Sequence, residues 1–272
     1  MTDKNLSRIA ALLRKAESTE NEHEADAYLQ AAQRLATLNS VDLAVARAHT
    51  TEKERRSVPE QRTIEIGPSG KRGLRTYVQL YLAIARANQV TCDIARNSTR
   101  VYAYGFDSDL DAVDALYSSL VVQMVRSCDA YLRSPERLAK DTVADVEDFW
   151  DGQRWRRRQV ERPVHATTAR INFQAAFAAR IGKRLAQARE KAQAEVVADT
   201  ARTGVELVLR AKEVELADHY KAHSTARGSW GGYRADAGHS EFSRRAGDRA
   251  GKVARLGANA EIGGARAGIE AR

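Results

Sequence analysis

One stretch of the chain constrains its fold most, because it changes from strand to helix within a few residues. Residues 100–104 favour a β-strand, and Gly105 then permits a sharp turn. Asp107 or Ser108 can cap the helix that follows, in which apolar residues recur at helical spacing over residues 110–125. A strand that leads directly into a long amphipathic helix predicts an α+β fold.

Signals elsewhere in the sequence support this fold class. Residues 64–66 and 90–94 favour strands, and the second run is close enough to residues 100–104 to form an antiparallel hairpin with it. Apolar periodicity predicts long helices over residues 74–88, 168–198 and 203–221. The predicted fold is therefore a predominantly helical α+β protein, with an N-terminal helical hairpin and a small antiparallel sheet covered by long helices.

The N-terminal region has its own helical pattern. Apolar positions over residues 6–16 and 25–36 predict an antiparallel helical hairpin, and Asn39 and Ser40 can cap a third, short helix. The run Ile-Ala-Ala-Leu-Leu-Arg-Lys-Ala-Glu-Ser-Thr at residues 9–19 resembles the bacterial and phage family catalogued as domain of unknown function 2786. The match continues in residues 22–27, 32–35 and 39–42. The resemblance implies a small helical domain and an intracellular or phage context, but no catalytic residue and no ligand.

The strand–turn–helix stretch carries a second resemblance. Its Gly-Phe-x-Ser-Asp-Leu-Asp-Ala turn is similar to that of domain of unknown function 7168, which often follows the first domain. The matching residues are Val101, Gly105, Phe106, residues 108–112, Leu120, Gln123, Ala169, Arg170, Phe173, Ala178, Arg180, Ile181, Arg184 and Leu185. This resemblance implies no activity either.

These patterns divide the chain into four parts. We expect a helical N-terminal domain over residues 1–48, a polar linker over 49–62 and an α+β domain over 63–222. Within that domain, the polar residues near 134–164 are expected to form an insertion or partly ordered loop. Residues 223–272 read as a tail rich in Gly, Arg and Ala, because frequent glycine makes a continuous helix costly; a short helix is possible near residues 242–256.

Charge patterning indicates a candidate nucleic-acid site. The net charge of +8 is unevenly distributed, since residues 101–150 contain ten acidic and only four basic side chains. An arginine cluster follows this acidic region, consisting of Arg154, Trp155, Arg156, Arg157 and Arg158. Guanidinium groups bind phosphates, and an indole can stack on an unpaired base. The alternative is a solvated basic loop that pairs with the acidic stretch before it. A second basic and aromatic set comprises Arg227, Trp230, Tyr233, Arg234, Arg244, Arg245 and Arg249.

Signs of metal or catalytic chemistry are weak. His219 and His223 are four residues apart on a predicted helix, a spacing that lets two imidazoles meet one metal, but no third ligand can be named. The alternative is a pair of polar histidines at a helix C-terminus. The aspartates at 107, 109, 111 and 114 do not fit a calcium-binding loop. Capping and stabilisation of the helix dipole explain those from 107 to 111. We therefore expect no cofactor and two buried, unpaired cysteines, Cys92 and Cys128.

The leading functional hypothesis is a non-enzymatic protein that associates with nucleic acid or takes part in an assembly, in a bacterial or phage setting. Its expected partners are a DNA or RNA backbone, a protein partner or further copies of itself. The alternatives are a metal-dependent hydrolase using His219 and His223, and a structural subunit that binds protein through its Ala-rich helices. No apolar run long enough for a membrane span is present and the first residues carry no apolar signal region, so we expect a cytoplasmic protein.

Overall fold

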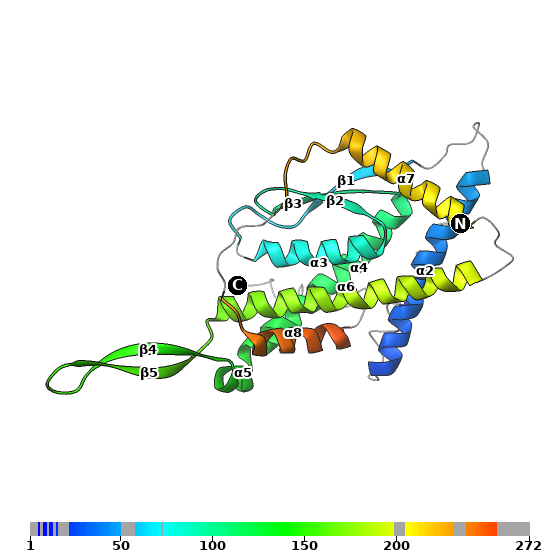
Figure 1. Cartoon of the computed structure of the whole chain (residues 1–272). Coiled ribbons are helices and arrows are strands. Elements are labelled where there is room, and N and C mark those ends of the chain that lie inside the picture. Colours follow the sequence, from blue (N-terminus) through cyan, green and yellow to red (C-terminus); the bar gives the residue numbers. More distant parts are fainter. Residues whose placement is uncertain are drawn as a thin grey trace, which may run out of the picture.

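The computed structural model describes residues 22–49, 58–71, 73–198, 205–230 and 238–254, together with residues 5, 8, 9, 11, 12 and 15. The helices are α2 (Glu22–His49), α3 (Leu74–Ala87), α4 (Asp107–Arg133), α5 (Pro135–Lys140), α6 (Ala166–Ala198), α7 (Val205–His223) and α8 (Glu241–Val253). The strands are β1 (Glu60–Glu65), β2 (Thr91–Ile94), β3 (Arg100–Gly105), β4 (Thr142–Trp150) and β5 (Trp155–Pro163). The predicted fold class, α+β and predominantly helical, is confirmed (Figure 1).

The main sheet has three antiparallel strands in the order β1-β3-β2. Alternation along the central strand β3 places Val101 and Ala103 in the core shared with α3 and α4. Tyr102 and Tyr104 occupy the other face and pack against Leu216 of α7. Figure 1 shows α7 lying over this second face, while α3 lies on the opposite side of the sheet. The predicted β2–β3 hairpin and the long helix after Gly105 are confirmed.

The core lies where α3, α4 and α6 meet beneath the sheet. Its largest fully buried side chains include Tyr81, Leu120, Phe177 and Leu185. Small residues let these helices approach closely; a Cβ added to Gly182 of α6 would lie 3.0 Å from the Cβ of Ala83 in α3. Among the described residues, no helix is both long enough and apolar enough to cross a bilayer.

Part of the predicted tail is a docked helix, α8. It agrees with the short helix considered possible near residues 242–256, and it corrects the expectation that the whole of residues 223–272 is a tail. Helix α8 packs along α6, and two of its glycines lie at the contact. A Cβ added to Gly247 would lie 2.0 Å from the Phe173 carbonyl oxygen. A Cβ added to Gly251 would lie 3.0 Å from the Phe177 carbonyl oxygen. These glycines, counted in the sequence as helix breakers, permit the close approach of the two backbones. Residues 231–237 and 255–272 lie outside the described residues.

The N-terminal region differs from the prediction in one respect. Helix α2 continues unbroken through Asn39 and Ser40, so they do not cap a separate third helix. In the segment before α2, the structure describes residues 5, 8, 9, 11, 12 and 15, and all of them are helical. We call these residues the N-terminal helical segment. Asn5 of this segment donates to Asn39 of α2 at 2.8 Å, as expected for an antiparallel hairpin. The predicted linker ends before residue 62, because β1 begins at Glu60.

Residues 134–164 form regular structure, so the expectation of a partly ordered loop is wrong. Ser134 caps α5 by accepting from the backbone N–H of Arg137. The residues that follow form the two-stranded antiparallel sheet β4–β5. Its turn is closed by Asp151, whose carboxylate accepts from the backbone N–H groups of Gln153 and Arg154, and by Gly152, which has a φ of 97°. The many charges of the two strands concealed their strand pattern in the sequence.

Candidate functional site: a projecting β-arm

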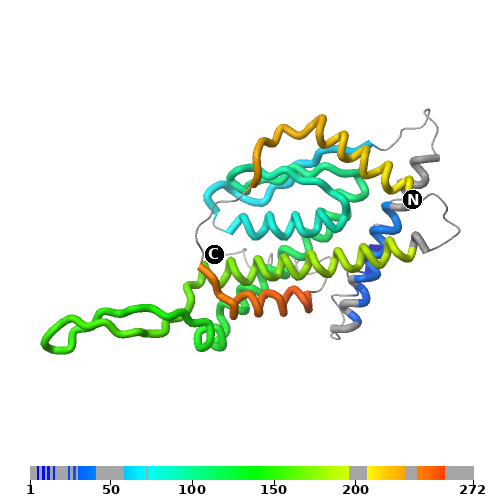
Figure 2. Tube along the Cα trace, in the orientation of Figure 1, coloured from blue at the N-terminus to red at the C-terminus, as the bar shows by residue number. Residues whose placement is uncertain are grey.

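Strands β4 and β5 form an arm that projects from the body of the molecule (Figures 1 and 2). We define this β-arm as residues 142–163. Each strand has nine residues, which corresponds to a reach of about 30 Å at a rise of about 3.3 Å per residue. The main contact of the β-arm outside its own two strands is with α5 at its root. A two-stranded hairpin standing in water gains little stability by itself, so the β-arm depends on the contacts at its root.

The root of the β-arm is fixed by a buried polar cluster around Asp141. This carboxylate accepts hydrogen bonds from the hydroxyls of Tyr131, Ser240 and Ser243 at 2.9, 2.6 and 2.6 Å. Ser240 is also the N-cap of α8. Directly after the end of β5, the Val164 carbonyl accepts a hydrogen bond at 2.5 Å from the buried Arg137 of α5. The β-arm is thus anchored at its base to both α4 and α8.

The charges of the β-arm neutralise one another across its two strands. It contains five arginines and five carboxylates. Arg158 pairs with Glu147 at 2.7 Å and Arg157 with Asp148 at 3.1 Å, each directly across the ladder. The remaining pairs are Arg162 with Asp145 and Glu147, and Arg156 with Asp151. Hydrogen bonds from Arg158 lower the pKa of Glu147, and those from backbone N–H groups lower the pKa of Asp151.

The tip of the β-arm is aromatic and exposed. Trp150 and Trp155 face each other across the last ladder position, with ring centroids 5.7 Å apart in an edge-to-face arrangement. Their exposed fractions are 54% and 70%. Val143 and Val146 of β4 are also more than half exposed. Large apolar side chains exposed together on a projecting element are typical of an interaction surface.

The structure does not bring the predicted arginine cluster onto one face. Arg156 and Arg158 point to one side of β5, whereas Trp155 and Arg157 point to the other. Among the described residues, no ion pair involves Arg154, which lies in the turn. The arrangement matches the alternative in which the basic run pairs with the acidic stretch before it. Nucleic-acid binding by these residues stays a prediction.

Members of the second basic set are dispersed. Arg244, Arg245 and Arg249 lie on the exposed face of α8, where Arg245 pairs with Glu241 at 3.1 Å. Trp230 is half-buried and donates to the Ser98 hydroxyl at 3.2 Å, so its indole is a packing element. Tyr233 and Arg234 lie outside the described residues.

His219 and His223 stack on each other, with ring centroids 4.1 Å apart. His223 Nδ1 lies 2.8 Å from the His219 carbonyl oxygen, at the C-terminus of α7. Burial and then the charge of His223 lower the pKa of His219. The part of the chain that the structure describes contains no group of three His, Cys, Asp or Glu residues placed to hold a metal ion. No third ligand therefore joins the two histidines there. Cys92 and Cys128 are free, and burial raises the pKa of each to about 12.

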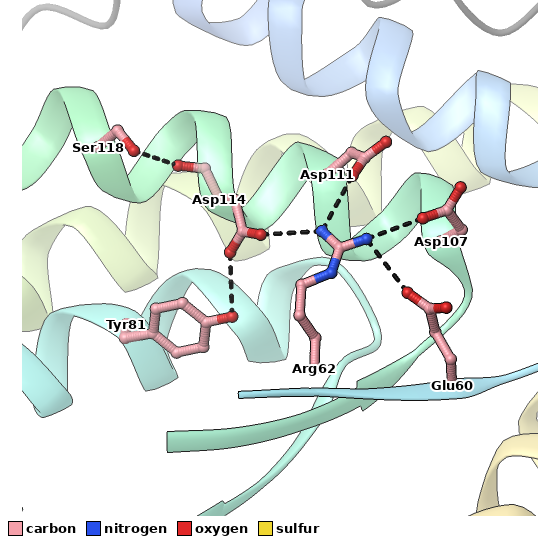
Figure 3. A network of polar contacts seen from close by, with 7 residues as sticks. All are labelled: Glu60, Arg62, Tyr81, Asp107, Asp111, Asp114 and Ser118. Carbon is pink, nitrogen blue, oxygen red and sulfur yellow. Dashed lines mark hydrogen bonds and ion pairs between the residues drawn. The ribbon is translucent and has the colours of Figure 1, made fainter. Parts of the chain in front are cut away.

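The aspartates of α4 have roles that capping did not predict. Phe106 occupies the N-cap position, and no side chain caps the helix. The guanidinium of Arg62 in β1 instead donates hydrogen bonds to carboxylates of both β1 and α4 (Figure 3). Its acceptors are Asp111 and Asp114 at 2.9 Å, Asp107 at 2.8 Å and Glu60 at 3.2 Å. Burial lowers the pKa of Arg62, but the hydrogen bonds with Asp114, Asp111 and Glu60 outweigh this effect and raise the pKa above its usual value. Tyr81 also donates to Asp114, at 3.3 Å.

Asp109, another acidic residue of α4, forms a buried ion pair with Lys212 of α7. Their N–O distance is 2.6 Å, and the two side chains are 5% and 4% exposed. The Lys212 ammonium also donates to the Ser40 hydroxyl of α2. The adjoining cavity measures about 20 Å³, enough for a single water molecule and too small for a substrate. This cluster is a cross-link between three helices, one of which belongs to the N-terminal region.

Comparison with known proteins places a family only on the N-terminal region. A family described as protein of unknown function, DUF2786, matches residues 4–43. The match covers the N-terminal helical segment and most of α2, and so supports the first of the two resemblances. No curated protein and no solved structure matches the chain. The β-arm lies outside the matched residues.

Proposed function

We propose that this chain is an assembly protein whose β-arm inserts into a protein partner. The observation that carries the proposal is the exposed pair Trp150 and Trp155 at the tip of an arm whose charges are neutralised internally. Aromatic side chains with few rotatable bonds are the residues that most often dominate binding energy at protein interfaces. The anchored root supports the same role, because a fixed arm loses little conformational freedom when it binds.

The charge balance favours protein over nucleic acid. Binding to a nucleic-acid backbone draws its affinity from cations that neutralise phosphates and release counterions. Most arginines of the β-arm already contact carboxylates of β4 or of the turn. Moving them to phosphates would leave those carboxylates unpaired beside the nucleic acid.

A second candidate function rests on Arg154 and Trp155 alone. The two residues are adjacent at the tip, Trp155 is 70% exposed, and no ion pair within the described residues engages Arg154. An exposed indole beside a guanidinium can stack on an unpaired base and contact its phosphate. This candidate predicts weak, salt-sensitive binding to single strands.

Site-specific photo-cross-linking in cells tests the main proposal. A photoreactive residue in place of Trp150 is expected to cross-link to a defined protein, whereas the same residue in place of Glu161, near the root, is expected not to. Absence of any protein adduct from position 150 would overturn the proposal. Salt-titrated binding of single- and double-stranded DNA and RNA tests the second candidate, and loss of binding in the Arg154→Ala variant would support it.

The proposal also includes the setting of the protein. We place it in the cytoplasm of a bacterium or of a phage-infected cell, consistent with the resemblance of its N-terminal region. We further propose that the body after the linker is related to domain of unknown function 7168. The strand, turn and helix at Arg100–Gly105 and Asp107–Arg133 support this relation by having the expected order.

A further inference from the structure

An open trough between α6 and α8 presents arginines to solvent. Figures 1 and 2 show α8 lying along α6 on the side away from the main sheet. The trough has a volume of about 520 Å³, and its lining from α6 consists of Ala176 and Ala179. Its lining from α8 includes Arg244, Arg245 and Arg249, all of them exposed. Because the side chains from α6 are only methyl groups, a ligand can come close to the guanidiniums.

Two of these three arginines have no ionic partner among the described residues. Arg245 already pairs with Glu241 at 3.1 Å. Asp248, the other carboxylate of the lining, is already paired across the helix contact at 2.5 Å. Within the part of the chain that the structure describes, no ion pair involves Arg244 or Arg249. These two guanidiniums can therefore bind an anion without breaking an ion pair of the described protein.

Two lysines extend this positive surface. Hydrogen bonds from Arg180 make the largest contribution to the lowered pKa of Asp248. The charges of Lys183 and Lys252 lower it further, which places both lysines near this carboxylate. We call the exposed cations of the surface the basic row, made up of Lys183, Arg244, Arg249 and Lys252. From position 244 to position 252 the row extends about 12 Å, at a rise of about 1.5 Å per residue, so it suits a chain of phosphates better than a single one.

The surroundings of the basic row favour duplex nucleic acid over other polyanions. A duplex carries one phosphate charge per about 1.7 Å of its axis, so several phosphates fall within the length of the row. The trough lining contains no aromatic side chain on which an unpaired base can stack. A helix that binds a membrane surface inserts an apolar face. The face of α8 that carries Ala246, Gly247 and Gly251 is instead buried in the protein.

We infer that the basic row binds the phosphate backbone of duplex nucleic acid. Each unpaired guanidinium can donate two parallel hydrogen bonds to phosphate oxygens, and the lysines add point charges. Contacts to phosphates alone carry no sequence information, so binding is expected to be independent of sequence. The basic row and the β-arm share no residue, so this site goes beyond the proposed assembly function.

Fluorescence anisotropy of a labelled, mixed-sequence DNA duplex tests the inference. The full chain is titrated into the duplex between about 50 and about 200 mM salt, and the wild type is expected to bind less tightly as salt rises. The row variant carries Arg244→Ala and Arg249→Ala. It is expected to weaken binding by more than about tenfold at low salt. It should also reduce the slope of log affinity against log salt by about 1.8, because each phosphate contact contributes about 0.9.

Two further variants separate the basic row from net charge and from misfolding. The matched control carries Arg96→Ala and Arg210→Ala, which remove the same charge from exposed positions in the β2–β3 turn and on α7. It is expected to bind nearly as tightly as the wild type. Glu241→Gln releases Arg245 from its ion pair and is expected to tighten binding by about threefold, a gain that a misfolded chain would not show. Circular dichroism verifies that each variant is folded.

Several outcomes would overturn the inference. One is a wild-type chain that does not bind the duplex at low salt, and another is a folded row variant that binds as tightly as the wild type. Equal losses in the row variant and the matched control would show that net charge alone drives binding. Vesicles containing phosphatidylglycerol are the second probe, and binding to them without binding to the duplex would assign the row to a membrane surface. Duplex binding that depends on Arg154 and not on the row would assign it to the tip of the β-arm.

Discussion

The body and the β-arm both contain dense sets of opposite charges, yet the two sets do different things. Around Arg62 and Lys212, charges from distant parts of the sequence converge on a half-buried guanidinium and on a buried ammonium. On the β-arm, the pairs join neighbouring strands and are largely exposed. Exposed pairs contribute little stability, whereas breaking a buried pair is costly. The charges of the body therefore link distant segments of the chain, and those of the arm leave it electrically neutral.

Replacing Lys212 by Met should have the largest effect. The substitution leaves Asp109 buried without its partner, which is expected to reduce the free energy of unfolding by about 4 kcal/mol. Urea denaturation followed by circular dichroism measures the loss. The double variant Lys212→Met with Asp109→Leu should recover most of it, since no unpaired charge remains. A single variant as stable as the wild type would show that this cluster does not hold the helices together.

Replacing Arg62 by Ala should have an intermediate effect. The carboxylates of Asp107, Asp111 and Asp114 then repel one another, and we expect a loss of about 2 kcal/mol because the site is partly exposed. Salt screens this repulsion, so the difference from the wild type should shrink as the ionic strength rises. Urea midpoints in low and high salt measure this trend, and a difference that grows with salt would contradict it.

The pair of Arg180 and Asp248 on α6 and α8 should contribute less. Hydrogen bonds from Arg180 at 2.7 and 2.5 Å lower the pKa of Asp248, so the folded carboxyl loses its proton more readily than the unfolded one. Its stabilisation is present above a pH of about 4 and is lost as the pH falls below that value. Asp248→Asn should cost less than about 1 kcal/mol at pH 7, because the pair is partly exposed. Comparing unfolding curves of variant and wild type at pH 7 and pH 2.5 measures this cost, which should be smaller at the lower pH.

Replacing Arg157 and Arg158 by Gln should change stability least. Both side chains are more than half exposed, and the global unfolding midpoint is expected to stay within error of the wild type. Thermal melts in low and high salt measure the effect. A clear drop in the midpoint would show that the ion pairs of the β-arm stabilise the fold as the clusters around Arg62 and Lys212 do.

Much of the fold could be predicted from the sequence, because periodicity reports burial along a single element. The helix over Leu74–Ala87 and the pairing of Thr91–Ile94 with Arg100–Gly105 follow from local patterns. The pairing of Arg62 with three aspartates, and of Lys212 with Asp109, could not be predicted, because each depends on contacts distant in sequence. The β-arm was missed for another reason. It buries no continuous face, so the alternation that marks a strand is weak in β4 and β5.

The hydrogen bonds at Asp141 also link the β-arm to events during synthesis. Asp141 receives Ser240 and Ser243 from a segment about one hundred positions later in the chain. A growing polypeptide therefore reaches the β-arm well before it contains the residues that fix the direction of that arm. Until α8 has been synthesised, the root of the β-arm has only the hydrogen bonds from Tyr131 to Asp141 and from Arg137 to the Val164 carbonyl. The position of α8 in the chain therefore makes the fixed direction of the β-arm a late event in folding.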